Sequence, residues 1–228
     1  MAWGLKGLRI LLSEILPIVL GEDDIIVAVI GAAGAGKTTF IDAVSNRKKI
    51  WANHSLKSES IRNIQATLVK HKGFPGRRIY LLDTPGFDDK PKPVEVLGMI
   101  HKWLSRRRGK PKAKQLSGLI YLQRITDTRM ETSMLEALRD CHTLGGKNMT
   151  IDKILFATTM WGSNQLSNGP EERSELEREN KIRSMVKEYI GRARVDRFRE
   201  RTTEEAWRVL KSVLREVLEG QREDSGEQ

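Results

Sequence analysis

The stretch GAAGAGKT, residues 31–38, fits the pattern G-x-x-x-x-G-K-[ST] in full. In such a loop the small residues let backbone N–H groups turn inward around phosphate oxygens, the lysine adds positive charge at the β- and γ-phosphates, and the threonine hydroxyl can ligate Mg²⁺. An apolar strand precedes the loop, and an amphipathic helix follows and directs its positive end at the anion. We therefore predict nucleotide-phosphate binding. The predicted contacts are Gly31, Ala32, Gly34, Ala35, Gly36, Lys37, Thr38 and Thr39.

A second element, IYLLDTPGF at 79–87, ends an apolar strand in a carboxylate. Asp83 there can reach the Mg²⁺ shell, usually through water, so we predict Thr38 and Asp83 as metal ligands. The N–H of Gly86 can bond a γ-phosphate, and we predict Lys37 and Gly86 as the catalytic groups. Asp-Thr-Pro-Gly alone is ordinary turn chemistry. Combined with the phosphate loop, it favours a GTPase over a kinase-type NTPase.

Phe87 follows Gly86, where many small GTPases place a glutamine that orients the attacking water. Phenylalanine cannot orient water, so we expect hydrolysis to be slow or to be completed by a group from elsewhere. Arg124 and Arg129, at the end of another apolar strand, could supply charge in cis. A surface or structural role is the favoured interpretation of both arginines, because a catalytic arginine needs intact switch geometry.

The run that normally recognises the base is unusual. In most GTPases this strand ends in Asn/Thr-Lys-x-Asp, whose aspartate binds guanine, whereas ATTMW at 157–161 has no lysine and no carboxylate. Its position still predicts that Thr158, Thr159, Met160 and Trp161 line the nucleotide pocket. Threonine hydroxyls could accept the guanine donors weakly. Trp161 could stack on the base or simply pack the strand end, so these residues leave the choice of base open.

The elements that must position these residues follow from the apolar pattern. Alternation of strands and helices predicts a three-layer α/β domain with a mostly parallel sheet covered on both faces. Ligands of such sheets lie at the carboxyl ends of the strands, where each motif falls. Strands are expected at 24–31, 64–70 (an edge strand), 77–83, 118–124, 151–158 and 193–198. One helix is expected to begin at residue 37 and a second to span 94–104. Three more are expected to begin at the capping box Thr128-x-x-Glu131, after residue 169, and at the capping box Thr202-x-x-Glu205.

Length and composition fit one domain with appendages: 228 residues, 39% hydrophobic and 31% charged, with a net charge of +10. We predict an N-terminal helix at 1–22, a nucleotide-binding domain at 23–220 and a disordered tail at 221–228. The apolar stretch at 8–20 is short and interrupted by charges and a proline, so it does not predict a membrane span. Packing on the domain or a partner is favoured over reversible contact with a membrane surface.

The single cysteine, Cys141, excludes an internal disulfide and fits a reducing, cytoplasmic setting. The scattered histidines predict no metal site built from protein ligands alone. The basic run at 106–114 could bind a polyanion or act as a nuclear-localisation signal, but a solvated helix end is the favoured interpretation. We do not expect nucleic-acid binding.

Together these residues resemble the septin-like GTPases, in which DTPGFDD follows GxxGxGKTTFI. The closest resemblance is to fungal G domain-containing proteins, through SLKSESIRNIQ, GLIYLQRITDTRM and ATTMW. Similar fungal proteins usually read Ser-Cys-Thr in the first stretch. This maps the metal-binding switch threonine onto Ser60, whereas position alone leaves Ser55, Ser58 and Ser60 open. The resemblance spans 24–218 and implies a Ras-like G domain, Mg²⁺ with GTP or GDP, and dimerisation across the nucleotide.

The first functional hypothesis is a GTP-binding switch with slow Mg²⁺-dependent GTPase activity, with activation by homodimerisation as one route and an unidentified protein effector. The alternative is a non-hydrolysing nucleotide-binding module, which Phe87 and the missing base aspartate keep open. An ATP-dependent kinase or ATPase is less favoured, because the chain has the Asp-Thr-Pro-Gly element and no obvious arginine-rich lid.

Overall fold

A computed structural model describes residues 20–21, 23–46, 63–87, 91–105, 115–127, 132–139, 149–162, 170–192 and 194–225. The strands are β1 (Ile25–Gly31), β2 (Gln65–Val69), β3 (Ile79–Asp83), β4 (Gly118–Arg124), β5 (Ile154–Thr159) and β6 (Arg194–Arg197). The helices are α2 (Lys37–Ser45), α3 (Pro93–Ser105), α4 (Thr132–Arg139), the short 3₁₀ turn η2 (Ile151–Lys153), α6 (Pro170–Ile190) and α7 (Thr203–Ser225).

The strands form one sheet in the order β2-β3-β1-β4-β5-β6. All neighbours are parallel except β2, which pairs antiparallel with β3 at the edge. Strands β1, β3 and β5 are buried along their whole length, as expected when both faces of a parallel sheet are covered. The predicted α/β class and the edge position of the second strand are confirmed.

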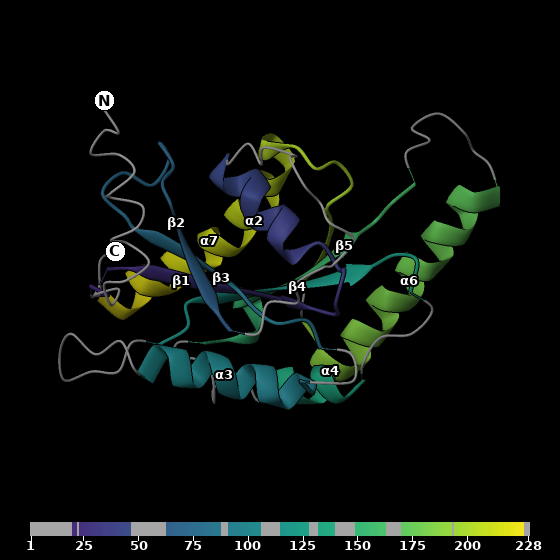
Figure 1. Cartoon of the computed structure of the whole chain (residues 1–228), viewed down its shortest axis with the longest axis horizontal. Helices are drawn as coiled ribbons and strands as arrows, with labels where there is room; N and C mark the ends of the chain where they lie inside the picture. The colour runs from purple at the N-terminus through teal and green to yellow at the C-terminus, as the bar shows by residue number, and fades with distance from the viewer. Residues whose placement is uncertain are drawn as a thin grey trace, which may run out of the picture.

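Helices cover both faces of the sheet (Figure 1), and an apolar layer lies between the helices and the sheet on each face. Helices α2 and α7 cover one face, and α3, α4 and α6 cover the other. Side chains alternate along β1: Ile26, Ala28 and Ile30 face the second group of helices, whereas Ile25, Val27 and Val29 face the first. Within α2, the inward residues Phe40, Ile41 and Val44 are buried as the spacing predicts.

The capping box at Thr202 is formed in part. The Thr202 hydroxyl accepts the Glu205 N–H at 3.2 Å. The Glu205 carboxylate does not complete the reciprocal bond but accepts the N–H groups of Arg199 and Glu200. Helix α7 continues to Ser225 and so extends into the segment 221–228 that the sequence analysis assigned to a tail.

Several predictions concern residues outside the described part of the chain. These are the helix proposed within 1–22, the three switch serines, the basic run at 106–114, the capping box at Thr128 with Arg129, and Cys141. Within the described ranges, no helix has the length and apolar character needed to cross a bilayer.

Candidate nucleotide-binding site

The loop between β1 and α2 has the backbone that its glycines predict. Gly34 and Gly36 have φ values of 73° and 91°, in the left-handed region that L side chains rarely adopt. At Gly31 a Cβ would lie 2.4 Å from the carbonyl oxygen of Leu122 on β4. Backbone conformation therefore explains Gly34 and Gly36, and close approach to the neighbouring strand explains Gly31.

Lys37 begins α2 and folds back over the loop. Its side chain is buried, and Nζ donates to the carbonyl oxygens of Gly31 at 2.9 Å and Ala32 at 2.8 Å. The N-terminal end of α2 has no side-chain cap, because the residue before it is Gly36. Both the ammonium group and the N-terminal N–H groups of α2 are thus directed at the loop, as an anion site requires.

Asp83 meets the phosphate loop from β3, the neighbour of β1. The Thr38 hydroxyl donates to the Asp83 carboxylate at 2.7 Å. The next residue, Thr84, fixes this strand end to β1 by donating to the Val29 carbonyl at 2.9 Å. A hydroxyl and a carboxylate oxygen side by side are ligands of the kind that Mg²⁺ prefers, so the residues fit the predicted ion. Across the described ranges, no cluster of three or more His, Cys, Asp or Glu side chains could hold a metal without the nucleotide.

The loop after β3 lies directly against the phosphate loop. A Cβ at Gly86 would lie 2.6 Å from Cα and 2.7 Å from the backbone nitrogen of Ala33, so only glycine fits this contact. The following Phe87 is 1% exposed, and its ring centroid lies 5.8 Å from that of Tyr121 in the core. Phe87 therefore anchors this loop, and its side chain offers no group that could orient water.

Arg124, at the end of β4, reaches the same loop. Its Nη1 lies 3.4 Å from the position that a Cβ would take at Gly34, and its Nε pairs with the Asp127 carboxylate at 2.9 Å. Arg124, one of the two arginines that could supply catalytic charge from the same chain, thus lies against the phosphate loop. Asp127 neutralises part of the Arg124 charge.

The end of β5 adjoins the other side of the loop. The Thr159 hydroxyl donates to the Ala35 carbonyl at 3.0 Å. Met160 has a φ of 58°, and its Cε lies 3.7 Å from the Cβ position at Gly36. The Thr158 hydroxyl turns to β6 and donates to the Asp196 carbonyl at 3.2 Å. Of the predicted pocket residues on this strand, Thr159 and Met160 touch the loop, whereas Thr158 does not direct its hydroxyl there.

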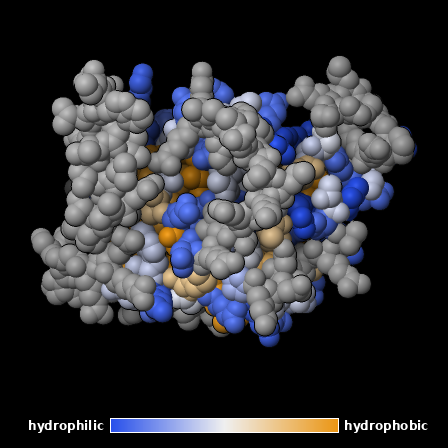
Figure 2. Space-filling view, viewed as in Figure 1, coloured by the Kyte–Doolittle hydropathy of each residue, from blue (hydrophilic) through white to orange (hydrophobic). Residues whose placement is uncertain are grey.

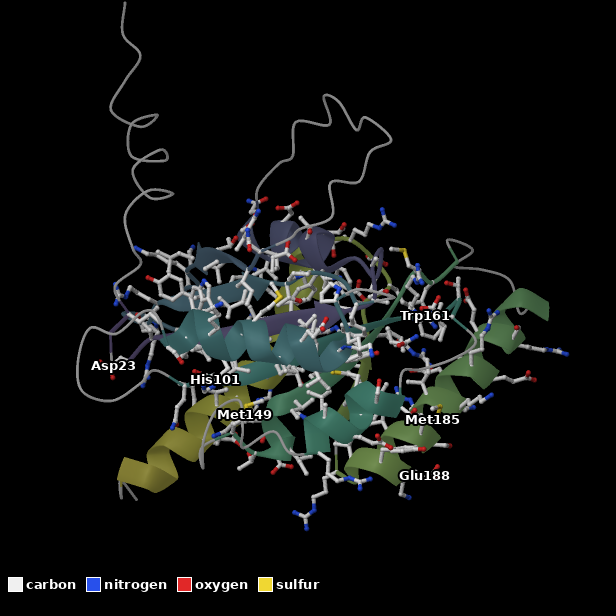
Figure 3. All side chains as sticks on the ribbon, turned by 60° about the horizontal axis from the view of Figure 1, so that its bottom comes forward. Asp23, His101, Met149, Trp161, Met185 and Glu188 are labelled. Atoms are coloured by element: carbon white, nitrogen blue, oxygen red, sulfur yellow. The ribbon has the colours of Figure 1, made fainter. Side chains whose placement is uncertain are left out.

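Trp161, labelled in Figure 3, is half-buried and packs against the core on the face covered by α3, α4 and α6. Its indole N–H donates to the Thr158 carbonyl at 3.1 Å. The guanidinium carbons of Arg197 and Arg199 lie 4.9 and 4.5 Å from the ring centroid, within cation–π range. These contacts fit the packing role that was the alternative to base stacking for Trp161.

Two carboxylates near this strand end escaped the sequence analysis. Glu179 on α6 is buried and accepts hydrogen bonds from Arg197 at 3.0 Å and Arg183 at 2.7 Å. Burial alone would raise the pKa of Glu179, but the hydrogen bonds and charges of the two arginines together lower it. Glu175, one turn earlier, accepts the Gly162 N–H at 2.9 Å. No motif contains these residues, because helix α6 brings them from outside the strand-end run.

The fold and this geometry define a class. Four features together characterise P-loop nucleoside triphosphatases. These are a buried parallel strand, a glycine loop with left-handed residues, a helix that starts at a folded-back lysine, and a carboxylate on the adjacent strand. The sequence model of a family described as "50S ribosome-binding GTPase" matches residues 26–157, more than half of the chain. The chain belongs to this family of P-loop GTPases.

Solved structures with the same fold include Toc33 from Arabidopsis thaliana. A dimerisation-deficient mutant of Toc33 matches with a TM-score of 0.58 and 14% identity, over 86% of this chain and 85% of that one. Toc33 with GDP and Mg²⁺ matches with a TM-score of 0.57 and 15% identity, over 93% and 89%.

A third structure matches with a TM-score of 0.57 and 13% identity, over 93% of this chain and 88% of that one. Its description states that dimerisation is important for the GTPase activity of the chloroplast translocon components atToc33 and psToc159. Identities this low show a shared fold and nothing finer. No curated protein sequence matched this chain.

Proposed function

We propose that this protein is a GTP-binding switch that hydrolyses GTP slowly in the presence of Mg²⁺. The observation that carries the proposal is the 2.7 Å hydrogen bond between Thr38 of the phosphate loop and Asp83 of the neighbouring strand. It places a hydroxyl and a carboxylate beside a loop whose lysine and glycine backbone suit a triphosphate. Family membership and the Mg²⁺–GDP complex of Toc33 support guanine nucleotide and Mg²⁺ as the ligands.

Each residue has a distinct part in this proposal. The loop N–H groups and Lys37 bind and orient the β- and γ-phosphates, and Thr38 and Asp83 would hold Mg²⁺. Bound there, the ion would neutralise the negative charge that develops on the phosphates during transfer. Gly86 would donate its N–H to the γ-phosphate. The contact between Gly86 and Ala33 would then couple the presence of that phosphate to the loop after β3.

Slow intrinsic turnover follows from the side chains around the γ-phosphate. Phe87 is buried in the core, so the glutamine role has no substitute at that position. Arg124 lies against the loop but pairs with Asp127, which lowers the charge it can offer in cis. A homodimer that faces its two nucleotides could supply the missing group. Support comes from Toc33, whose dimerisation is described as important for GTPase activity.

Further parts of the proposal rest on sequence alone. The motif DTPGFDD supports placement among the septin-like GTPases. The stretches SLKSESIRNIQ, GLIYLQRITDTRM and ATTMW support a likeness to fungal G domain-containing proteins, with Ser60 as the switch hydroxyl. The helix within 1–22 would bind the domain or a partner, and the single cysteine supports a cytoplasmic protein.

A non-hydrolysing module is the second candidate, and the buried Phe87 is the observation that favours it. Its nucleotide would serve only to shape a surface for a partner. The dependence of turnover on protein concentration distinguishes the two candidates. Turnover by a dimer rises with protein concentration, whereas a non-hydrolysing module shows no turnover at any concentration.

Two measurements test the proposal. Displacement of a fluorescent GTP analogue by GTP, GDP and ATP reports the base, and we expect GTP and GDP to compete at least tenfold better than ATP. Equal competition by ATP would reject a GTP switch. Single-turnover phosphate release at low and high protein concentration should show a slow rate that rises with concentration. No release in either condition would identify the non-hydrolysing module.

A further inference from the structure

Helix α6 carries a carboxylate to the end of β5, where the strand itself has none. Glu175 Oε1 accepts the backbone N–H of Gly162 at 2.9 Å, although the two residues lie 13 positions apart. We propose that Glu175 is the residue that recognises the guanine base. This inference rests on the proposed function and adds to it the residue that determines nucleotide specificity.

The placement of the base follows from the two sides of the phosphate loop. On one side, Thr38 and Asp83 mark the metal and the γ-phosphate. On the other side, the Thr159 hydroxyl binds the Ala35 carbonyl and Met160 lies over Gly36. A nucleotide whose triphosphate follows the loop must direct its ribose and base toward the β5 side. The residues immediately after Met160 are therefore the ones that meet the edge of the base.

The Glu175 carboxylate lies beside Gly162, two residues after Met160, where the strand end has no carboxylate of its own. A Cβ built on Gly162 would lie 3.4 Å from Glu175 Oε1 and 4.0 Å from Oε2. These are ordinary van der Waals distances, so the Glu175 carboxylate lies in direct contact with position 162. The end of β5 thus has a carboxylate beside it that comes from α6 and not from its own sequence. Among the coloured atoms over α6, Figure 2 shows mostly hydrophilic residues.

The chemistry of guanine fits one carboxylate at this place. Guanine presents the N1–H and an N2–H donor on one edge, and the two oxygens of an ionised carboxylate accept such a pair. Oε1 retains acceptor capacity beyond its bond to Gly162, since each carboxylate oxygen has two lone pairs. Adenine presents the N1 lone pair at the same edge, which a carboxylate repels. Glu175 would therefore favour GTP over ATP.

Other carboxylates at this end of the sheet have cationic partners. Glu179 binds Arg197 and Arg183, and the Asp196 carboxylate accepts two bonds from Arg208 at 2.7 and 2.8 Å. Among the described residues, no lysine or arginine forms an ion pair with Glu175. The half-buried Glu175 carboxylate instead accepts a backbone N–H, that of Gly162, whereas those of Glu179 and Asp196 bind arginines of the protein itself.

The substitution Glu175→Gln tests this assignment by exchanging one acceptor for a donor. Xanthine differs from guanine in carrying an oxygen in place of the 2-amino group, so the glutamine N–H₂ can donate to it while the amide oxygen accepts the N1–H. We expect GDP affinity to fall by about 10- to 100-fold, the range for losing a hydrogen bond to a charged group, and XDP affinity to rise. Titration of each diphosphate against the full chain, by calorimetry, measures both.

Controls separate this inference from the proposed function. Glu177→Gln, an exposed position on the same helix, should leave the GDP-to-XDP ratio unchanged. The gain in XDP binding cannot arise from a misfolded protein, so it remains decisive if the variant loses stability. An unchanged ratio in Glu175→Gln overturns the assignment of Glu175 while leaving the GTPase intact. Failure of the unsubstituted protein to bind GDP would reject the proposed function itself.

Discussion

The two sides of the candidate site are built in different ways. On the phosphate side, the residues assigned to the phosphates and the metal belong to two short motifs, GAAGAGKT and DTPG, and Thr38 and Asp83 meet because β1 and β3 are neighbours. On the base side, the strand end contacts residues that belong to no motif: Glu175 on α6 contacts Gly162, and Arg197 on β6 contacts Trp161.

The difference has a physical origin. A phosphate chain needs many convergent N–H groups and a fixed backbone, and only a continuous loop with left-handed glycines supplies them. A purine edge needs only one or two acceptors at the right place, and any element that reaches the strand end can deliver them. Evolution of the chain can therefore move the base-reading group between elements more freely than it can alter the loop.

The largest effect is expected from Lys37→Ala, which acts on the phosphate side alone. Removing the ammonium should lower affinity for GDP and XDP alike by about 100-fold or more, because charged hydrogen bonds to the phosphates are lost. Fluorescence titration measures the affinity, and the ratio between the two bases should not change. Lys181→Ala, an exposed lysine on α6, is the control. Undiminished affinity in Lys37→Ala would mean that the loop does not bind phosphate.

The same contrast explains what the sequence could predict. The loop, Asp83 and the alternation of strands and helices could be predicted, because glycine spacing and apolar runs encode them locally. The partners of Trp161 and the carboxylate at Gly162 were not, because they depend on how α6 and the segment after β6 pack against the strand end. The sequence showed only that the run at 157–161 lacks a carboxylate, and it gave no signal that Glu175 contacts the residue after it.

A smaller effect is expected from Glu179→Ala, which tests how the base side is supported. Glu179 holds Arg197, which in turn lies over Trp161. Breaking a buried ion pair costs about 3–5 kcal/mol when both charges are buried. The arginines here are 36% and 43% exposed and can regain water, so we expect the free energy of unfolding to fall by about 2–3 kcal/mol. Urea denaturation measures it, with the exposed Glu177→Ala as control.

The pH dependence of the unfolding free energy gives a second test of Glu179. Its pKa is lowered from the ordinary 4.5, so the folded protein holds the carboxylate ionised more strongly than the unfolded chain does. This contribution is present in full well above pH 4.5 and is lost as the pH falls through the folded-state pKa. Glu179→Gln should therefore show a shallower loss of stability below pH 4.5 than the unsubstituted protein. Parallel curves would mean that the two arginines do not stabilise this carboxylate.

The smallest effect is expected where the two sides meet, at the bond from the Thr159 hydroxyl to the Ala35 carbonyl. Thr159→Val keeps the shape and removes the donor, which should cost about 1 kcal/mol and weaken GDP binding several-fold by loosening the loop against β5. Thr158→Val is the control on the same strand, because it removes the bond to the Asp196 carbonyl on β6 and an acceptor for the Trp161 indole N–H. We expect it to lower stability by a similar amount without changing GDP affinity. Equal effects of the two variants on GDP affinity would show that β5 acts on the loop through packing alone. The phosphate side and the base side would then be coupled through the core and not through the hydrogen bond from Thr159 to Ala35.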